Sequence, residues 1–295
     1  MDLSGFDCSI LDSTNCLLGE GPTYDPETDT LWWFDITGRK LLEHRLGDGH
    51  SAIHDLPFLC SALAVADGGR QVIASENGLY ERSPSDGALT RIVGIEADDE
   101  TTRSNDSRVH PCGAFWVGTM SKIGQENAGS IYHYFRGELK PIFTGITVTN
   151  AICFSADGSV GYFTDTPTGK VMRVSLDPQS GLPIGQAEAF IVRTPDHPGW
   201  ADGAVIDADG LMWIARWDGS CVQAYDAAGS VVETIRLPAS QITCPAFIGK
   251  DASRMILTSA AEGISEQRLI EQPHAGMTFM IDRRVNGRIE PKVRL

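Results

Sequence analysis

The chain repeats one short pattern at a nearly constant interval. Each copy begins with a polar turn that contains Asp or Pro and often Gly, and continues into short strands rich in Trp, Phe, Tyr, Ile and Val. The six copies span residues 23–36, 65–81, 109–120, 154–166, 206–217 and 248–260. Their turn residues, at positions 25, 67, 111, 157, 209 and 251, are separated by 42, 44, 46, 52 and 42 residues. A period of ~40 to 50 residues with four strands per unit is typical of the blades of a β-propeller.

Two other architectures explain this pattern less well. Helical repeats of similar length need amphipathic stretches of about ten or more residues, and the sequence contains no convincing one. A β-sandwich or a pair of β domains would use the same strands and Asp-Gly turns but has no reason to repeat them at this interval. No linker or shift in composition divides the chain. The sequence therefore predicts an all-β protein, a six-bladed β-propeller with four-stranded antiparallel blades that forms a single domain over residues 1–295.

Charge and cysteine content exclude several classes of partner. The 295 residues include 24 Lys and Arg against 39 Asp and Glu, a formal net charge of −15, which opposes binding to nucleic acid or to an anionic membrane surface. No apolar stretch approaches the ~18 residues of a membrane helix, and the N-terminus lacks the basic residues of a secretory signal. The seven cysteines are odd in number and form no C-x-x-C pair. We therefore expect reduced thiols in a cytoplasmic protein.

Three oxygen-bearing side chains occupy similar places in different repeats. Glu20, Asn150 and Asp202 precede the turn residues of the first, fourth and fifth copies by 5, 7 and 7 residues. In a propeller, similar offsets place side chains at one mouth of the central channel. Two carboxylates and one amide oxygen form a set of hard ligands suited to Ca²⁺, Mg²⁺ or Mn²⁺, with Zn²⁺ possible. We therefore predict one divalent metal ion there, with open positions for water or substrate.

Each of these residues also has an ordinary structural explanation. An Asp followed by Gly is commonly part of a turn, an Asn before a strand commonly forms an Asx-turn, and a Glu can lie on a solvated rim. The prediction of a metal site therefore depends on the three residues occurring together at matching positions.

Four segments of the sequence resemble those of a known family: LGEGPTYDPETDTLWWFDI, SNDSRVHPCGAFWVGTM, TNAICFSADG and ADGAVIDADGLMWIARWDG. In their order and spacing they resemble the SMP-30/gluconolactonase/LRE family of regucalcin-like sugar lactonases, from about residue 17 to about residue 282. The resemblance implies that Glu20, Asn150 and Asp202 bind the divalent metal ion and that Asp202 is also the catalytic carboxylate. It further implies that Arg103 and Asn105 bind the sugar lactone, because the guanidinium donates hydrogen bonds and the amide both donates and accepts them.

One position of the family pattern has no counterpart in this chain. Animal members carry a substrate-binding acid a few residues after Gly-Thr-Met, where this chain has Ser121, Lys122 and Ile123. Glu126 lies nearby but is not assigned to that role. The amino-acid sequences of the motifs resemble most those of bacterial sugar-acid lactonases. This resemblance implies a pentono- or hexonolactone as substrate but does not identify the sugar.

The reaction implied by the resemblance is hydrolysis of an aldonolactone, such as arabinono-, glucono- or galactonolactone, to the open-chain acid by a carboxylic ester hydrolase. Two alternatives stay open: hydrolysis of organophosphates by a calcium-dependent propeller, and calcium binding without catalysis. Arg103 and Asn105 argue against the second alternative, because a calcium buffer needs no donors for a sugar ring. The signatures G-x-S-x-G, G-x-x-x-x-G-K-[ST], G-x-G-x-x-G and H-E-x-x-H are absent.

Two histidines and two tryptophans lie near the predicted site in sequence. We expect His110 and His197 in loops near the site, as structural residues or as contacts to the metal surroundings or substrate. Trp200 and Trp217 flank the strand that carries Asp202, and either wall the pocket or pack between blades.

Overall fold

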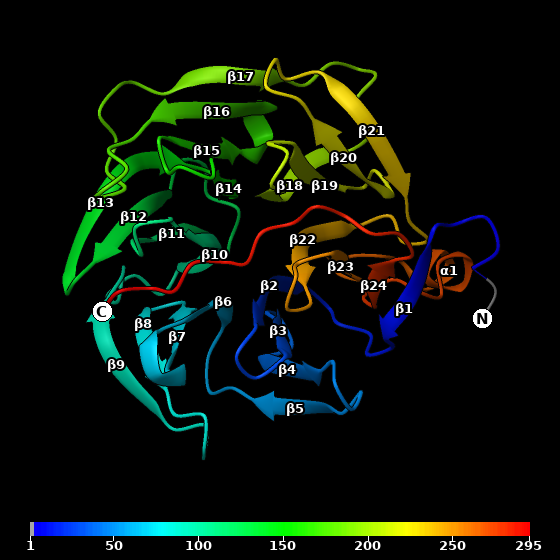
Figure 1. Ribbon diagram of the computed structural model, residues 1–295, viewed down its shortest axis with the longest axis horizontal. Coiled ribbons are helices and arrows are strands. Elements are labelled where there is room, and N and C mark those ends of the chain that lie inside the picture. The colour runs from blue at the N-terminus through cyan, green and yellow to red at the C-terminus, as the bar shows by residue number, and fades with distance from the viewer. Residues whose placement is uncertain (1–2) are drawn as a thin grey trace.

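The strands of this protein form a ring of small sheets around a central channel. The computed structural model describes residues 3–295, and within them six four-stranded antiparallel sheets are arranged radially, as Figure 1 shows along the channel. This arrangement confirms the predicted six-bladed β-propeller. No helix in the described part of the chain is long and apolar enough to cross a membrane.

The first half of the described chain forms three blades, each numbered here from its innermost strand outward. The first consists of β2 (Gly19–Asp25), β3 (Thr30–Asp35), β4 (Lys40–Arg45) and β5 (Ser51–Asp55). The second consists of β6 (Cys60–Val65), β7 (Gln71–Ser75), β8 (Gly78–Arg82) and β9 (Leu89–Gly94), with the short 3₁₀ turn η1 (Asp67–Gly69). The third consists of β10 (Thr102–Val109), β11 (Phe115–Ser121), β12 (Gly129–Phe135) and β13 (Glu138–Ile146).

The second half forms the remaining blades of the described chain. The fourth consists of β14 (Thr149–Phe154), β15 (Val160–Asp165), β16 (Lys170–Ser175) and β17 (Glu188–Val192), with the 3₁₀ turn η2 (Thr166–Thr168). The fifth consists of β18 (Trp200–Ile206), β19 (Met212–Trp217), β20 (Cys221–Tyr225) and β21 (Val231–Arg236). The sixth consists of β22 (Ile242–Ile248), β23 (Arg254–Ser259), β24 (Thr278–Ile281) and β1 (Cys8–Asp12), and the helix α1 (Glu266–Glu271) lies between β23 and β24.

The sixth blade joins the two ends of the chain. Its outer strand β1 comes from the N-terminus and pairs antiparallel with β24, so that Cys8 lies opposite Ile281. The ring is thereby closed by backbone hydrogen bonds between segments about 270 residues apart in sequence. The repeat pattern contains no sign of this pairing, because β1 precedes the first copy of the repeat.

The repeated turns connect the innermost strand of each blade to the second strand. In several of these turns an Asp side chain accepts a hydrogen bond from the backbone N–H group two residues later, as Asp25 does from Glu27 and Asp157 from Ser159, both at 3.0 Å. An Asp in such a turn satisfies a backbone donor that the strand pairing leaves free. The repeated sequence pattern is therefore the pattern of one hairpin in each blade.

The hydrophobic core lies between neighbouring blades. Side chains alternate along each strand, so Trp33 packs toward the sixth blade while the next residue, Phe34, packs toward the second. Both side chains are at most 1% exposed. Burying an aromatic side chain of this kind stabilises a fold by roughly 2 to 3 kcal/mol. The aromatic residues of the repeats thus hold adjacent blades together.

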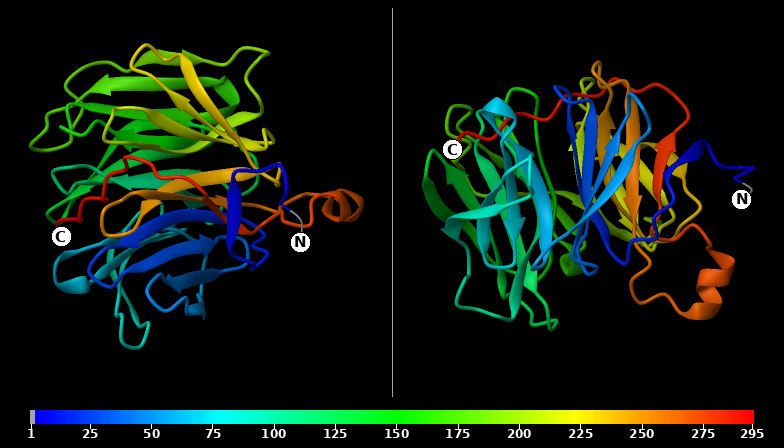
Figure 2. Two further views of the ribbon diagram at one scale, coloured as in Figure 1. Left: turned by 45° about the vertical axis from the view of Figure 1, so that its right-hand side comes forward. Right: turned by 90° about the horizontal axis from the view of Figure 1, so that it is seen from below.

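The two faces of the ring differ. The C-terminal segment, residues 283–295, crosses the channel on the face toward the viewer in Figure 1, where it is drawn in red. Figure 2, in its right-hand view, shows this segment and the helix α1 on opposite faces of the molecule. The face that carries α1 is the one at which the innermost strands β2, β10, β14 and β18 begin.

Candidate active site

The predicted site residues lie near the first residues of four innermost strands. Glu20 is on β2, Asn150 on β14 and Asp202 on β18, while Arg103 and Asn105 are on β10. Because these strands run in the same direction around the channel, residues near their beginnings meet at the same mouth. The structure therefore brings the five predicted residues together.

Each of these strands is irregular at the site. The pairing register shifts between Glu20 and Thr23, between Ser104 and Ser107, between Asn150 and Cys153, and between Ala201 and Ala204. A β-bulge inserts an extra residue and changes the direction in which the local side chains point. The bulges thus allow polar side chains to turn into the channel at positions where a regular strand would alternate.

The residues after Glu20 and Asn150 adopt a left-handed backbone conformation. Gly21 has φ 57° and Ala151 has φ 50°. A side chain at position 21 would lie 2.0 Å from the backbone oxygen of Ser61, so only Gly fits there. Ala151 is fully buried in the same backbone conformation, which is unusual for a residue with a Cβ and is typical of functional sites.

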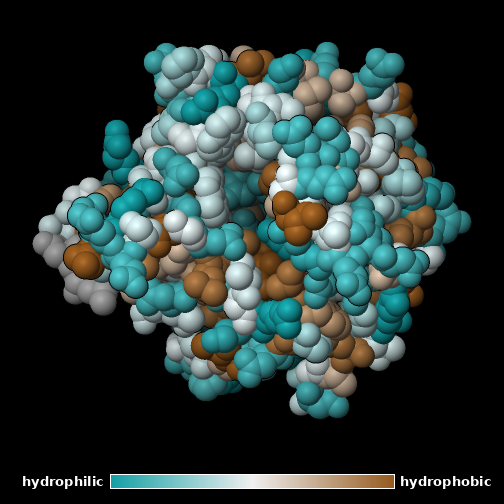
Figure 3. Space-filling view, turned by 180° about the vertical axis from the view of Figure 1, so that it is seen from behind, coloured by the Kyte–Doolittle hydropathy of each residue, from teal (hydrophilic) through white to brown (hydrophobic). Residues whose placement is uncertain are grey.

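The five predicted residues line one cavity of about 200 Å³. Its wall also contains Leu18, Met120, Val148, Thr166, Ala201, Trp217 and Glu262. Figure 3 shows the face opposite to that of Figure 1, which is hollowed near its centre where hydrophilic residues gather. The cavity is large enough for a small polar molecule and combines charged, amide and apolar groups.

Hydrogen bonds link these residues across three blades. Arg103 Nη1 donates to Asn105 Oδ1 at 2.7 Å, and Asn105 Nδ2 donates to Asn150 Oδ1 at 3.0 Å. Asn150 Nδ2 donates in turn to Thr166 Oγ1 at 3.0 Å, and the Thr166 hydroxyl donates to the backbone oxygen of Ala201 at 3.1 Å. These bonds fix the orientation of both amides: the Asn150 oxygen faces the Asn105 nitrogen, and the Asn150 nitrogen faces Thr166.

The two carboxylates of the site are buried close to one another. Glu20 is 7% and Asp202 5% exposed. Burial raises the pKa of both carboxyl groups, and nearby negative charges raise them further: that of Asp106 for Glu20, and those of Glu20 and Asp106 for Asp202. Two buried carboxylates without a compensating charge destabilise the fold unless they take up a proton or bind a cation.

The donor set fits a hard divalent cation. Two carboxylates and the Asn150 amide oxygen supply oxygen ligands only, as Ca²⁺, Mg²⁺ and Mn²⁺ prefer. Among residues 3–295 no group of three or more His, Cys, Asp or Glu side chains is placed to hold a metal ion. A metal site here would therefore depend on the amide and on water or substrate to complete its coordination.

Arg103 is the guanidinium of the cavity. Burial lowers its pKa, and carboxylates counteract this effect, with Glu262 acting most strongly, followed by Glu20 and Asp202. Besides its bond to Asn105, Arg103 Nη1 donates to the backbone oxygen of Ser104 at 2.9 Å. The remaining N–H groups of the guanidinium are available to oxygen atoms of a bound molecule.

Several cavity residues were not predicted from the sequence. Thr166 and Glu262 follow the second strands of their blades and reach the mouth only in the folded ring. Met120, on β11, belongs to the Gly-Thr-Met motif but had been given no role. Trp217 lines the cavity, as one of its two predicted roles requires, whereas Trp200 lies beside it on the surface and stacks under the guanidinium of Arg193.

The expectation that His110 lies near the site is wrong. His110 follows the end of β10, at the opposite end of the channel, where it bonds to the turns around Gly158 and Cys112. His197 lies in the loop before β18 and bonds to Thr194 without lining the cavity. The unassigned Glu126 is exposed and does not line the cavity either.

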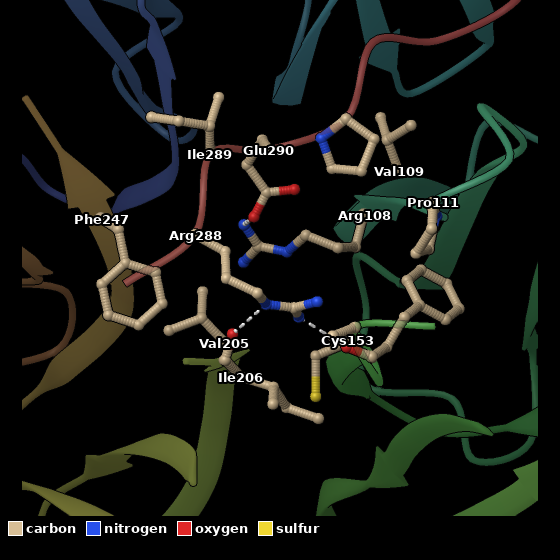
Figure 4. Close-up of a pocket in the computed structure, with 13 residues that line it drawn as sticks. Arg108, Val109, Pro111, Cys153, Val205, Ile206, Phe247, Arg288, Ile289 and Glu290 are labelled. Atoms are coloured by element: carbon tan, nitrogen blue, oxygen red, sulfur yellow. Dashed lines mark hydrogen bonds and ion pairs between the residues drawn. The ribbon is translucent and has the colours of Figure 1, made fainter. Parts of the chain in front are cut away.

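The far mouth of the channel is closed by the C-terminal segment. Figure 4 shows Glu290 against Arg108, which it pairs with at 2.9 Å, and Arg288 extended across the channel. Arg288 donates to the backbone oxygens of Ile206 and Phe154, the last residues of β18 and β14. These contacts surround a cavity of about 270 Å³ that lies at the other end of the channel from Glu20 and Asp202. Molecules therefore reach the candidate site from the α1 face.

The fold and site define a class of protein: a six-bladed β-propeller whose channel is closed at one mouth and carries an oxygen-rich site at the other. The family model of the SMP-30/gluconolactonase/LRE-like region matches residues 18–261. The chain belongs to this family.

Individual relatives agree with this assignment. A solved structure of the calcium-binding protein regucalcin from Agrobacterium tumefaciens is 46% identical, with a TM-score of 0.96 and 98% of each chain covered. The pentonolactonase of Haloferax volcanii is 31% identical over 293 residues, which cover 94% of this chain and 94% of the relative. The L-arabinolactonase of Azospirillum brasilense is 30% identical over 287 residues, which cover 95% of this chain and 93% of the relative.

Proposed function

We propose that this protein is a sugar lactonase that hydrolyses a pentono- or hexonolactone to the aldonic acid. The observation that carries the proposal is the Arg103–Asn105–Asn150 hydrogen-bond chain. It lies in the same cavity as the buried carboxylates of Glu20 and Asp202, so hydrogen-bond donors for a substrate and possible metal ligands line one space. Relatives over nearly the full length of the chain are a pentonolactonase and an L-arabinolactonase, which supports the same reaction class.

The proposed cofactor is one divalent metal ion held by Glu20, Asn150 and Asp202. A bound cation at this place supplies Lewis-acid polarisation of the lactone carbonyl or of water. It also compensates the two buried carboxylates, which supports the assignment on electrostatic grounds. Calcium is the metal associated with the regucalcin of similar structure, whereas the chemistry of the ligands is equally suited to Mn²⁺ or Mg²⁺.

The proposed roles of the chain's own residues follow from their position. Asp202 accepts a proton from the attacking water, because it is the buried carboxylate on the strand beside Asn150. Arg103 and Asn105 donate hydrogen bonds to ring and carbonyl oxygens and thereby hold the lactone in one orientation. Trp217 and Met120 offer apolar surface to the C–H face of the ring.

A neutral lactone also suits the charge of the molecule. The net charge of −15 disfavours anionic ligands and nucleic acid, whereas an uncharged ring enters the cavity without that repulsion. All seven cysteines lie in the described chain and are free, which supports the proposed cytoplasmic location.

Calcium binding without catalysis is a second candidate, favoured by the regucalcin of similar structure. The two functions differ in whether Arg103 and its neighbours in the cavity are needed for the turnover of a lactone. A protein that only binds calcium has no turnover of lactones, while a lactonase has turnover that depends on these residues.

Proton release during lactone hydrolysis tests the proposal directly. Arabinono-, glucono- and galactonolactone and a phosphotriester are assayed with Mn²⁺, Mg²⁺, Ca²⁺ or Zn²⁺ and after treatment with EDTA, against the uncatalysed background. We expect turnover of at least one lactone, its loss after metal removal, and a drop of about 10³-fold or more in Asp202→Asn. Asp196→Asn, an exposed carboxylate in the neighbouring loop, serves as the matched control.

Each part of the proposal has its own contrary result. Unchanged activity after complete metal removal contradicts the metal assignment. Full activity in Asp202→Asn contradicts its role as proton acceptor. Turnover of the phosphotriester alone, or of none of the compounds, contradicts the lactonase itself.

A further inference from the structure

One carboxylate of the candidate cavity has no role in the proposed reaction. Glu262 lies in the segment between β23 and β24, which also carries α1, on the same face as the site. Its side chain lines the cavity together with Arg103 and Trp217, although the sequence motifs do not include it. Unlike Glu20 and Asp202, it is exposed to solvent.

Glu262 is held in place from two sides. The hydroxyl of Thr37, in the first blade's turn after β3, donates to Glu262 Oε1 at 2.9 Å. The Gln241 side chain, just before β22, donates to the backbone oxygen of Glu262 at 3.0 Å. Within residues 3–295 the second carboxylate oxygen, Oε2, makes no hydrogen bond or ion pair. The side chain is thus oriented by one oxygen and leaves the other free to accept hydrogen bonds.

The depth of the site residues sets the direction in which a lactone enters. Glu20, Asn150 and Asp202 are 5 to 7% exposed and form the inner end of the cavity, whereas Glu262 lies at the rim. A lactone whose carbonyl faces the buried carboxylate pair therefore places its hydroxylated side chain toward Glu262. Arg103 lines the same cavity as Glu262 and Glu20.

We propose that Glu262 is a specificity-determining residue of this site, which accepts a hydrogen bond from a hydroxyl of the substrate's side chain and excludes lactones that carry an anionic group there. The inference rests on the proposed lactonase function and narrows its substrate class to neutral, unphosphorylated lactones. A sugar hydroxyl donates readily to a fixed carboxylate oxygen. A phosphate or sulfonate at the same place has no proton to donate and meets a like charge.

The test compares two lactones that differ in this group. D-glucono-1,5-lactone and 6-phospho-D-glucono-1,5-lactone are assayed with the full-length wild type and with Glu262→Gln, and each rate is corrected for spontaneous hydrolysis. Gln has the same shape and can still accept the Thr37 hydroxyl, so the fold and the cavity are preserved. Glu266→Gln, in the same segment but outside the cavity, is the matched control.

We expect Glu262→Gln to lower kcat/KM for the neutral lactone about 10- to 100-fold, mainly through KM, because hydrogen bonds to charged groups contribute that much to binding. For the phosphorylated lactone kcat/KM should rise or stay the same. The ratio of kcat/KM for the neutral lactone to that for the phosphorylated lactone therefore decreases. Thr37→Val removes the donor that orients Glu262. It should change kcat/KM for each of the two lactones in the same direction as Glu262→Gln does, but by a smaller factor. Glu266→Gln should match the wild type.

The failure of this inference differs from the failure of the proposed function. An active wild type whose ratio between the two lactones is the same in Glu262→Gln overturns the specificity role and leaves the lactonase intact. Equal losses on both lactones show a structural role for Glu262 and overturn the inference as well. A wild type that hydrolyses neither these lactones nor the others of the panel overturns the proposed function, and the inference falls with it.

Discussion

Asn105 Nδ2 donates a hydrogen bond to Asn150 Oδ1 at 3.0 Å and thereby joins the third blade to the fourth inside the channel. The same Nδ2 donates to the backbone oxygen of Thr149 at 2.8 Å, so the amide is fixed by two acceptors. A residue proposed to contact substrate is thus also the residue that orients a proposed metal ligand. A change in the proposed substrate-binding part of the site should therefore also affect the proposed metal-binding part.

Asn105→Ala should therefore weaken metal binding although Asn105 is not itself proposed as a ligand. Loss of a residue that orients a metal ligand typically lowers affinity about 10- to 100-fold. Isothermal titration of Ca²⁺ or Mn²⁺ into the metal-free protein measures the change. Asn286→Ala, which removes an exposed amide bonded to Asp209, should leave the affinity unchanged. An unaltered affinity in Asn105→Ala argues that the Asn150 oxygen does not depend on this bond.

Glu20→Gln should make the metal-free protein more stable. Burial and the negative charge of Asp106 raise the pKa of Glu20 to about 8, so at pH 7 the folded state holds a proton that the unfolded chain has released. The stability from a raised carboxyl pKa is complete below the unfolded value of 4.5 and is lost as pH rises toward the folded value. Replacement by Gln removes this cost, for a gain of about 3 kcal/mol in the free energy of unfolding at pH 7.

The same variant should lose the stabilisation that metal provides to the wild type. At a metal concentration of 100 times Kd this stabilisation is about 2.7 kcal/mol. Urea unfolding with EDTA gives the stability of the metal-free protein, and unfolding with excess metal gives the stabilisation by metal. Glu126→Gln, at an exposed carboxylate, is the control. A Glu20→Gln protein that is less stable without metal and still responds to metal contradicts the assignment of Glu20 as a ligand.

The features that could be predicted from the sequence are those tied to its repeated pattern. Each repeat forms one hairpin, so the position of Glu20, Asn150 and Asp202 relative to their turns was enough to place them at one mouth. Arg103 and Asn105 came from the family motif and fall in the same cavity. These predictions succeeded because the geometry of a blade is local and the ring then brings equal positions together.

Other features depend on contacts that the repeat does not encode. The strand β1 completes the sixth blade, Glu262 reaches the cavity from an insertion beside α1, and Glu290 pairs with Arg108 from a segment about 180 residues away. Each lies outside the repeated hairpins, so no periodicity points to its partner. The wrong placement of His110 has a related cause. Arg103 and His110 are close in sequence, but the length of β10 lies between them, so they are at opposite mouths of the channel.

Glu290→Ala should strongly destabilise the fold. Arg108 is 6% exposed, its Nε has no partner within the described residues, and Glu290 is the carboxylate that pairs with its Nη1 at 2.9 Å. Removing Glu290 leaves the buried guanidinium with Asp106 as its remaining nearby carboxylate, and breaking a buried ion pair in this way costs about 3 kcal/mol. Urea unfolding of Asp251→Asn provides the comparison, because Asp251 pairs with Arg284 in the same C-terminal segment but both side chains are exposed. The control should change by less than about 0.5 kcal/mol, and equal effects in the two variants would contradict the structural role of the far-mouth pair.

His110 should make the fold sensitive to mild acid. Burial lowers the pKa of His110, whose ring is fully buried and bonded on both sides: Nε2 lies 2.9 Å from the Gly158 oxygen, while Nδ1 accepts from the Cys112 N–H at 3.1 Å. Protonation of Nδ1 would remove that acceptor, so the folded state holds the neutral ring.

Below the unfolded pKa of 6.5 the unfolded chain binds a proton that the folded protein does not, so this contribution to stability is complete above pH 6.5 and falls with decreasing pH. Between pH 7.5 and pH 5.5 the loss from one such histidine is at most about 1.4 kcal/mol, the value for a ring that stays neutral throughout. Other groups titrate in the same range, so the relevant measurement is the difference in unfolding free energy between wild type and His110→Gln, followed by urea unfolding across that range with excess metal. Gln keeps a donor and an acceptor of similar reach but does not titrate. The advantage of the wild type should shrink toward pH 5.5, by at most about 1.4 kcal/mol. A constant difference at every pH would show that the His110 ring is not held neutral by these contacts.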